Sequence, residues 1–184
     1  MRKVLFILGV LLSLGVFCAC SSDDEIDNES PDVLNNLTPI DKGDSFAAIS
    51  DFFKTAFNEE SKPFDFGNNL GNEENPCVII NNEEEFEEVY TGESSLPTID
   101  FSKYTLIIGK VFLSAGTFID NMNINHINRA KATLSINCII DSKGAYIGTI
   151  GYVYYWNLFP KFHASIINVE VSKKYGEIDD SKKQ

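Results

Sequence analysis

The sequence predicts a single α+β domain, in which an antiparallel β-sheet meander packs with one or two short helices. Three observations support this class. The chain has 184 residues, close to the usual size of one domain. An apolar pattern of helical period precedes a long series of short β-rich segments joined by turns. The apolar fraction of 43% and the charged fraction of 23% are ordinary for a globular protein, which excludes a mostly disordered chain and a multi-span membrane protein.

Two segments are expected to be helical. The first begins after Asp44 or Ser45 as N-cap and repeats apolar residues at steps of three and four, which places one apolar stripe against the core. The members of this stripe are Phe46, Ile49, Phe52, Phe53, Ala56 and Phe57. The second helix follows a short buried strand at 77–80. Asn81 or Asn82 is its N-cap, and Glu85 stands in the capping-box position three residues after Asn82.

Five strands are expected in the rest of the chain. The segment 132–140 alternates most clearly, so that Leu134, Ile136 and Cys138 share one face. The other strands are expected at 105–115, 117–125, 145–157 and 164–172. Short strands joined by turns favour an antiparallel meander.

The first residues have the pattern of a secretory signal. Arg2 and Lys3 precede an apolar run at 4–17, which is too short to span a bilayer comfortably. The run ends in Phe17-Cys18-Ala19-Cys20 and resembles a bacterial lipoprotein signal, which implies cleavage after Ala19 and lipidation of Cys20. Cys18 is the alternative, but the bulky Phe17 before the cut disfavours it. Two or three acyl chains would anchor the protein firmly, since each buried methylene contributes about 0.8 kcal/mol.

The residues after Cys20 are strongly acidic. Ser21-Ser22-Asp23-Asp24-Glu25 resembles the surface-export signal of Bacteroidota lipoproteins, which implies display on the cell surface; a periplasm-facing domain is the alternative. Residues 21–44 contain eight acidic residues, one lysine and no aromatic residue, which indicates a flexible tether. We therefore expect a signal peptide at 1–19, a lipidated tether at 20–44, a globular domain at 45–175 and a polar tail at 176–184.

The motifs of common enzymes and of nucleic-acid binders do not occur. The chain has no GxSxG, P-loop or GxGxxG sequence, and its two histidines stand without metal-ligand spacing. The sequence therefore predicts no catalytic residue, no cofactor and no metal. The net charge of −12 argues against a nucleic-acid partner, because such proteins carry basic patches that replace counterions.

Two further features bear on stability and binding. Cys77 and Cys138 remain after processing, and outside the cytoplasm they are expected either to form a disulfide or to stay as buried thiols. The aromatic segment 152–160 places Tyr152, Tyr154 and Trp156 on one face of a strand. That face is predicted either to bind a glycan or peptide or to be buried in the core.

A wider pattern covers residues 76–172. VIINNEEEFEEVY is followed by LPTIDFSKYTLIIGKVF and then by two or three strands. This order resembles the domains named after the protease-complex subunit PrcB, in which a short strand and helix precede an Asp-Phe-Ser-Lys-Tyr entry into a sheet, here at 100–104. The resemblance implies the same architecture and a role as an accessory or inhibitor of a protease.

These observations predict a non-catalytic outer-membrane lipoprotein, exposed at the cell surface, that binds a protein, peptide or glycan. The membrane is contacted through the lipid at Cys20. Two alternatives are a protease-associated accessory protein and a hydrolase whose catalytic residues are distant in the sequence.

Overall fold

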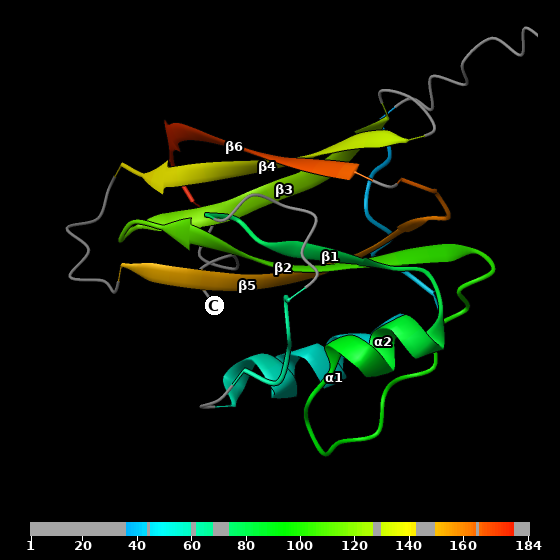
Figure 1. Ribbon diagram of the computed structural model, residues 1–184. Helices are drawn as coiled ribbons and strands as arrows, with labels where there is room; N and C mark the ends of the chain where they lie inside the picture. Colours follow the sequence, from blue (N-terminus) through cyan, green and yellow to red (C-terminus); the bar gives the residue numbers. More distant parts are fainter. Residues whose placement is uncertain are drawn as a thin grey trace, which may run out of the picture. The chain divides into compact units, whose positions relative to one another are not determined.

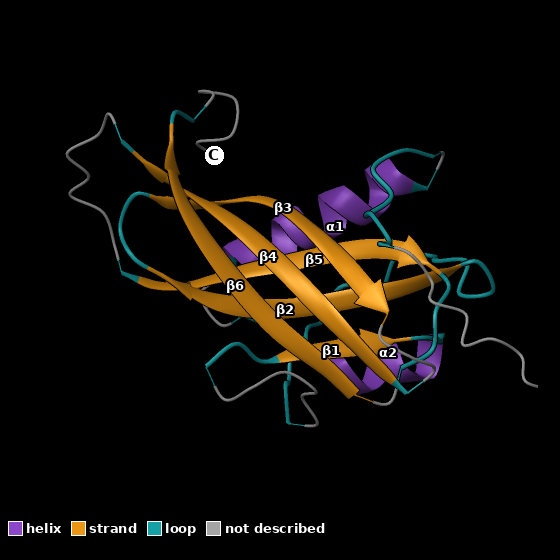
Figure 2. Cartoon of the chain, turned by 90° about the horizontal axis from the view of Figure 1, so that it is seen from above, coloured by secondary structure: helices purple, strands orange, loops and turns teal. Residues whose placement is uncertain are grey.

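Two three-stranded sheets and a pair of helices form three layers in the computed structural model (Figure 1). The structure describes residues 36–43, 45–59, 62–67, 74–126, 130–142, 150–164 and 166–178. The middle layer is an antiparallel sheet in the order β1-β2-β5, and the outer layer is a sheet in the order β3-β4-β6. Helices α1 and α2 cover the other face of the middle sheet (Figures 1 and 2). The elements are α1 (Phe46–Asn58), β1 (Cys77–Ile80), α2 (Glu83–Val89), β2 (Tyr104–Leu113), β3 (Thr117–His126), β4 (Lys131–Asp141), β5 (Gly151–Pro160) and β6 (Ile166–Gly176).

Strand β2 is buried on both faces because its sequence is apolar at consecutive positions. Leu106, Ile107 and Ile108 are all fully buried. Leu106 and Ile108 pack in the core beneath the helices, whereas Ile107 packs in the core between the two sheets. An uninterrupted apolar run is the pattern expected of a strand covered from both sides. In the middle sheet β2 lies between β1 and β5. Strand β5 pairs with β2 over its whole length, whereas β1 pairs only with residues 106–109.

The helices form as the sequence predicts. In α1 the buried residues Ile49, Phe53 and Ala56 lie on the predicted stripe. In α2 the Asn82 side chain accepts a hydrogen bond of 2.8 Å from the Glu85 backbone N–H. The Glu85 carboxylate in turn accepts one of 2.6 Å from the backbone N–H of Asn81. The predicted N-cap Asn82 is therefore confirmed, whereas Glu85 returns its bond to the backbone N–H of the preceding residue, Asn81, instead of to that of the N-cap itself.

The α+β class is confirmed, but the strands do not follow a simple meander. In a meander each strand pairs with the next one along the chain. Among strands β2 to β6 of the described residues, β3 and β4 are the one consecutive pair that does so. Strand β2 pairs with β5, and β6 returns parallel to β4. Alternation along a strand tells which side chains are buried and carries no information on which strand lies beside it, so the order could not be predicted.

The folded part begins earlier than the expected boundary at residue 45. Leu37 exchanges backbone hydrogen bonds of 2.7 and 2.9 Å with Ile124 of β3, and the Ile40 N–H donates one of 2.8 Å to Leu158 of β5. Residues 37–40 therefore run along the edges of both sheets and belong to the domain instead of the tether. At the other end, β6 continues to Gly176, just past the expected domain end at 175.

A glycine at position 109 permits a close approach between β2 and β5. Gly109 lies opposite Cys77 of β1 and opposite Tyr155 of β5. A Cβ atom at position 109 would lie 2.3 Å from the Tyr155 hydroxyl and 3.0 Å from the Cys77 Cβ atom. The Tyr155 ring therefore crosses the strand over the glycine, in space that any other residue would fill.

We predict that Gly109→Ala lowers the free energy of unfolding by about 1–3 kcal/mol, because Tyr155 is buried and has no free space to move into. Denaturant unfolding monitored by circular dichroism measures the change. The matched control is Gly151→Ala, where a new Cβ atom meets nothing within 4 Å and the free energy should change by less than about 0.5 kcal/mol. Equal effects of the two substitutions would contradict the close approach at Gly109.

Candidate functional site

The three predicted aromatic residues of β5 point to the helix side of the middle sheet but have different environments. Trp156 is covered by α1: its ring stacks on Phe53 at 4.6 Å between centroids, with an interplanar angle of 14°. It also contacts Phe46 at 5.5 Å. Trp156 therefore belongs to the core, which is the second of the two outcomes expected for this face.

Tyr152, at the other end of the face, is 47% exposed. Opposite it on β2 lies Phe112, which is 41% exposed, and the two rings form an edge-to-face pair with centroids 5.4 Å apart. The Lys110 ammonium lies 4.8 Å from the Tyr152 ring centroid and 5.6 Å from that of Phe66. These distances are within the range of cation–π attraction, so the lysine is held among the rings.

Tyr154 lies between the core and this exposed group. Its ring contacts Phe57 at the end of α1 at 5.7 Å and Phe66 at 6.2 Å. Partial burial raises the pKa of its phenol, and the neighbouring Tyr152 adds to the shift. We call the set of five residues the aromatic patch; its members are Phe66, Lys110, Phe112, Tyr152 and Tyr154.

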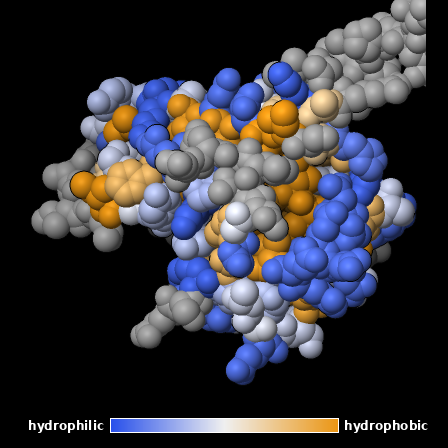
Figure 3. Space-filling view, viewed as in Figure 1, coloured by the Kyte–Doolittle hydropathy of each residue, from blue (hydrophilic) through white to orange (hydrophobic). Residues whose placement is uncertain are grey.

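The patch exists because the helical cover ends before the sheet does. Along the helix-side face of β2, buried Leu106 and Ile108 are followed by Lys110 and Phe112. Helix α1 ends at Asn58, near Tyr154, so neither of the described helices covers the last part of this face. Figure 3 shows hydrophobic side chains at the surface at this end of the middle sheet, where β2 ends and β5 begins.

The sequence pattern identifies two of the five patch residues and misses the other three. Tyr152 and Tyr154 were candidates, whereas Phe66, Lys110 and Phe112 were not. The alternation of β2 places Lys110 and Phe112 on one face, but only the β2–β5 register shows that they lie opposite Tyr154 and Tyr152.

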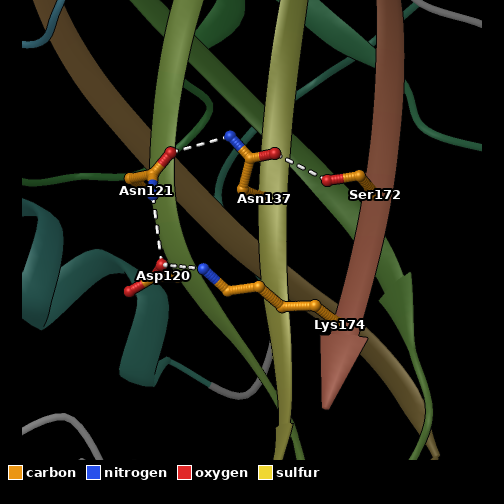
Figure 4. A network of polar contacts seen from close by, with 5 residues as sticks. All are labelled: Asp120, Asn121, Asn137, Ser172 and Lys174. Carbon is orange, nitrogen blue, oxygen red and sulfur yellow. Dashed lines mark hydrogen bonds and ion pairs between the residues drawn. The ribbon is translucent and has the colours of Figure 1, made fainter. Parts of the chain in front are cut away.

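The outward face of the β3-β4-β6 sheet is polar and internally hydrogen-bonded (Figure 4). The Asn137 amide donates a hydrogen bond of 2.7 Å to the Asn121 side chain, and the Ser172 hydroxyl donates one of 2.6 Å to Asn137. A β-bulge after Ile119 accompanies an ion pair of 3.4 Å between Asp120 and Lys174. These side chains tie the three strands together, which gives this row a structural role.

The two predicted disulfide partners are free, buried thiols in the structure, so the predicted disulfide is absent from it. The Tyr155 hydroxyl lies beside Cys77. Burial raises the pKa of Cys77 to about 12, and the adjacent Tyr155 hydroxyl opposes this shift only in part. Burial also raises the pKa of Cys138, against the effect of Lys173. Both thiols are therefore neutral at ordinary pH and unreactive.

The described ranges contain neither a candidate metal site nor a candidate membrane-spanning helix. These residues contain no group of three or more His, Cys, Asp or Glu side chains that could hold a metal ion. The described helices include none with the length and apolar composition needed to cross a membrane. Cys20 lies outside the described residues, as does the side chain of His126. His163 is exposed, three residues after β5 ends.

No family model, curated protein or solved structure matches the chain.

Proposed function

We propose that the protein is a non-catalytic, lipid-anchored binding module of the outer membrane, displayed at the cell surface, which binds a protein or peptide partner at the aromatic patch. The observation that carries this proposal is the pair Phe112 and Tyr152. Both rings are more than two fifths exposed, and Phe112 stands between Val111 and Leu113, which are buried. Exposed aromatic side chains on a rigid element, with a cation beside them, are typical of interaction surfaces.

The geometry of the rings favours a polypeptide over a glycan. The Phe112 and Tyr152 planes meet at 74°, so the pair presents a stepped surface instead of one flat platform. An apolar side chain of a partner fits such a step, whereas a sugar stacks best on an open ring face. Lys110 adds one positive charge at the centre of the patch, which suits a partner segment with an acidic residue next to its apolar anchor.

The sequence before the domain supports the anchor. Cys20 follows a signal-like run, and the segment between it and the first described residue, Asn36, carries six acidic residues and no basic one. Anionic lipid headgroups repel such a segment, which keeps the domain away from the bilayer. This arrangement suits a module that meets partners in the surrounding medium. The protease-associated and hydrolase alternatives stay predictions.

The double variant Phe112→Ala/Tyr152→Ala is predicted to lose binding to peptides selected on the intact protein from a displayed random library, with dissociation constants raised at least about tenfold. Its unfolding midpoint should fall only modestly, because more than two fifths of each side chain is already exposed in the folded protein. The matched control is Tyr175→Ala, which removes a ring that is 79% exposed on β6 and should bind the peptides normally.

Selected peptides that bind the double variant as tightly as the parent would exclude the patch. The same protein should be tested on a glycan array. Binding there that depends on Phe112 and Tyr152, with no peptide ligand, would show that the partner class is wrong.

We predict that the protein incorporates radiolabelled fatty acid in a bacterial host that processes lipoproteins, and that Cys20→Ala abolishes the label and releases the chain from the membrane fraction. The matched control is Cys18→Ala, which should still be labelled. Loss of label from Cys18→Ala alone would move the lipid to that residue, and a labelled Cys20→Ala variant would exclude Cys20 as the anchor.

A further inference from the structure

Strand β6 forms an edge of the outer sheet along its whole length. Its strand neighbour is β4, which it pairs with from Ile166 to Gly176, and the described residues place no other segment along its second side. A strand with one neighbour leaves about half of its backbone N–H and C=O groups facing solvent. An edge of eleven residues in this state is long enough to receive another strand.

The side chains of β6 are arranged so that the strand complements itself. Glu170, Ser172 and Lys174 share the outward face of the sheet. A negative charge therefore stands two residues before the serine, and a positive charge two residues after it. If two such strands run antiparallel with Ser172 opposite Ser172, each Glu170 lies opposite a Lys174. Opposite charges in directly facing positions stabilise antiparallel pairs.

We propose that β6 pairs antiparallel with β6 of a second copy of this chain, about a twofold axis at Ser172, which joins the two outer sheets into one of six strands. In this register Glu170 faces the partner's Lys174, and Lys174 faces the partner's Glu170. Because the two contacts are related by symmetry, the interface closes and a dimer results.

Neighbouring registers lack this match. Residues directly opposite each other in an antiparallel pair have side chains on the same side of the sheet. The twofold axis must therefore pass between two copies of the same residue. An axis at Val171 places Glu170 opposite the partner's Ser172. An axis at Lys173 places Lys174 opposite the partner's Ser172, so in both registers a charged residue faces a neutral one. An axis at Glu170 or Lys174 places like charges opposite each other. Of these five registers, only the one centred on Ser172 pairs both charges.

The other face of the strand agrees with the same register. Tyr175 is 79% exposed, the highest value among the large exposed hydrophobic residues described. In the proposed dimer it lies opposite the partner's Val169, and aromatic and β-branched side chains form favourable cross-strand pairs. Lys173 lies opposite the partner's Val171, which its aliphatic stem can cover.

The hydrogen-bonded row of the outer sheet leads to the proposed axis. Hydrogen bonds join three side chains across the sheet, from Asn121 of β3 through Asn137 of β4 to Ser172 of β6 (Figure 4). The row ends at Ser172 on the open edge. In the dimer the two rows end side by side at their serines, each of which keeps its single donor on Asn137 of its own chain. Lys174, whose side chain is 64% exposed, holds Asp120 within its own chain; its ammonium has further N–H donors for a second carboxylate.

A competing explanation is that Lys173 and Lys174 protect the edge from pairing, as charged residues do on many exposed edge strands. Cysteine cross-linking distinguishes the proposed dimer from a protected, unpaired edge. Facing Cα atoms in an antiparallel pair are about 4.5–5.5 Å apart, which a disulfide can bridge. The full chain carrying Ser172→Cys, purified in detergent, should therefore form a covalent dimer as its main species on mild oxidation.

The matched control is Asn168→Cys, which is also exposed on the outward face of β6. In the proposed register it lies opposite the partner's Gly176, and the two introduced thiols would be roughly 26 Å apart. This variant should stay at the background set by the unsubstituted chain, because the chain's own cysteines are the same in all three proteins. Ser172→Cys at background, equal cross-linking of both variants, or cross-linking of Ser172→Cys only to a different protein would each overturn the proposal.

Charge reversal tests the register in a second way. Glu170→Lys should raise the dissociation constant of the dimer, measured by analytical ultracentrifugation, by about tenfold, because two symmetric ion pairs become two repulsions. Lys174→Glu should do the same, although it also loses the contact with Asp120. The double variant Glu170→Lys/Lys174→Glu restores both pairs with their signs exchanged and should recover most of the affinity. Failure of the double variant to recover would exclude the Ser172 register.

Discussion

The burial of β2 on both faces is the constraint on which the rest of the structure depends. The strand carries apolar residues at consecutive positions, so it needs cover from two directions at once. The outer sheet supplies the cover on one side, with Leu134 and Ile136 of β4 in the shared core, and the helices supply it on the other. Each large apolar side chain buried in this way contributes roughly 1.5–3 kcal/mol, which makes the three-layer arrangement the stable one.

The same constraint explains where a binding surface can form. On the helix-side face of β2, the buried Ile108 is followed by the charged Lys110, and α1 ends near this point. Beyond it the strand does not need a helix to cover it. The aromatic rings beyond it still stand on the rigid middle sheet. They are therefore held in place while remaining exposed, which is the property that a preorganised docking site requires. The outward face of the outer sheet differs, because it is polar and its side chains form hydrogen bonds with one another.

Much of this structure could be predicted from the sequence, and the missing part has a common cause. The helix at 46–58, the N-cap at Asn82 and the five later strands are local patterns, set by neighbours within a few residues. The partners of β2, the parallel return of β6 and the contact of Leu37 with Ile124 depend on residues far apart in the chain. The alternation of apolar and polar residues along a strand does not specify which strand or segment pairs with it.

The candidate site shows the same division. Period-two alternation correctly placed Tyr152, Tyr154 and Trp156 on one face, yet it could not tell that α1 covers Trp156 and leaves Tyr152 open. Burial along a strand changes where the overlying element ends, and that position is a tertiary property. Gly109 is a similar case, because its importance depends on Tyr155 crossing from a strand 46 residues later.

Native-state hydrogen exchange of the full chain tests the central claim most directly. If β2 is the doubly covered centre, the amide protons of Leu106, Ile107 and Ile108 should be among the slowest to exchange and should open only with global unfolding. At concentrations low enough to keep the chain monomeric, the amides of the edge strand β6 that face away from β4 should exchange much faster. Rapid exchange at Leu106–Ile108, at rates like those of the β6 edge, would contradict a structure organised around a strand buried on both faces.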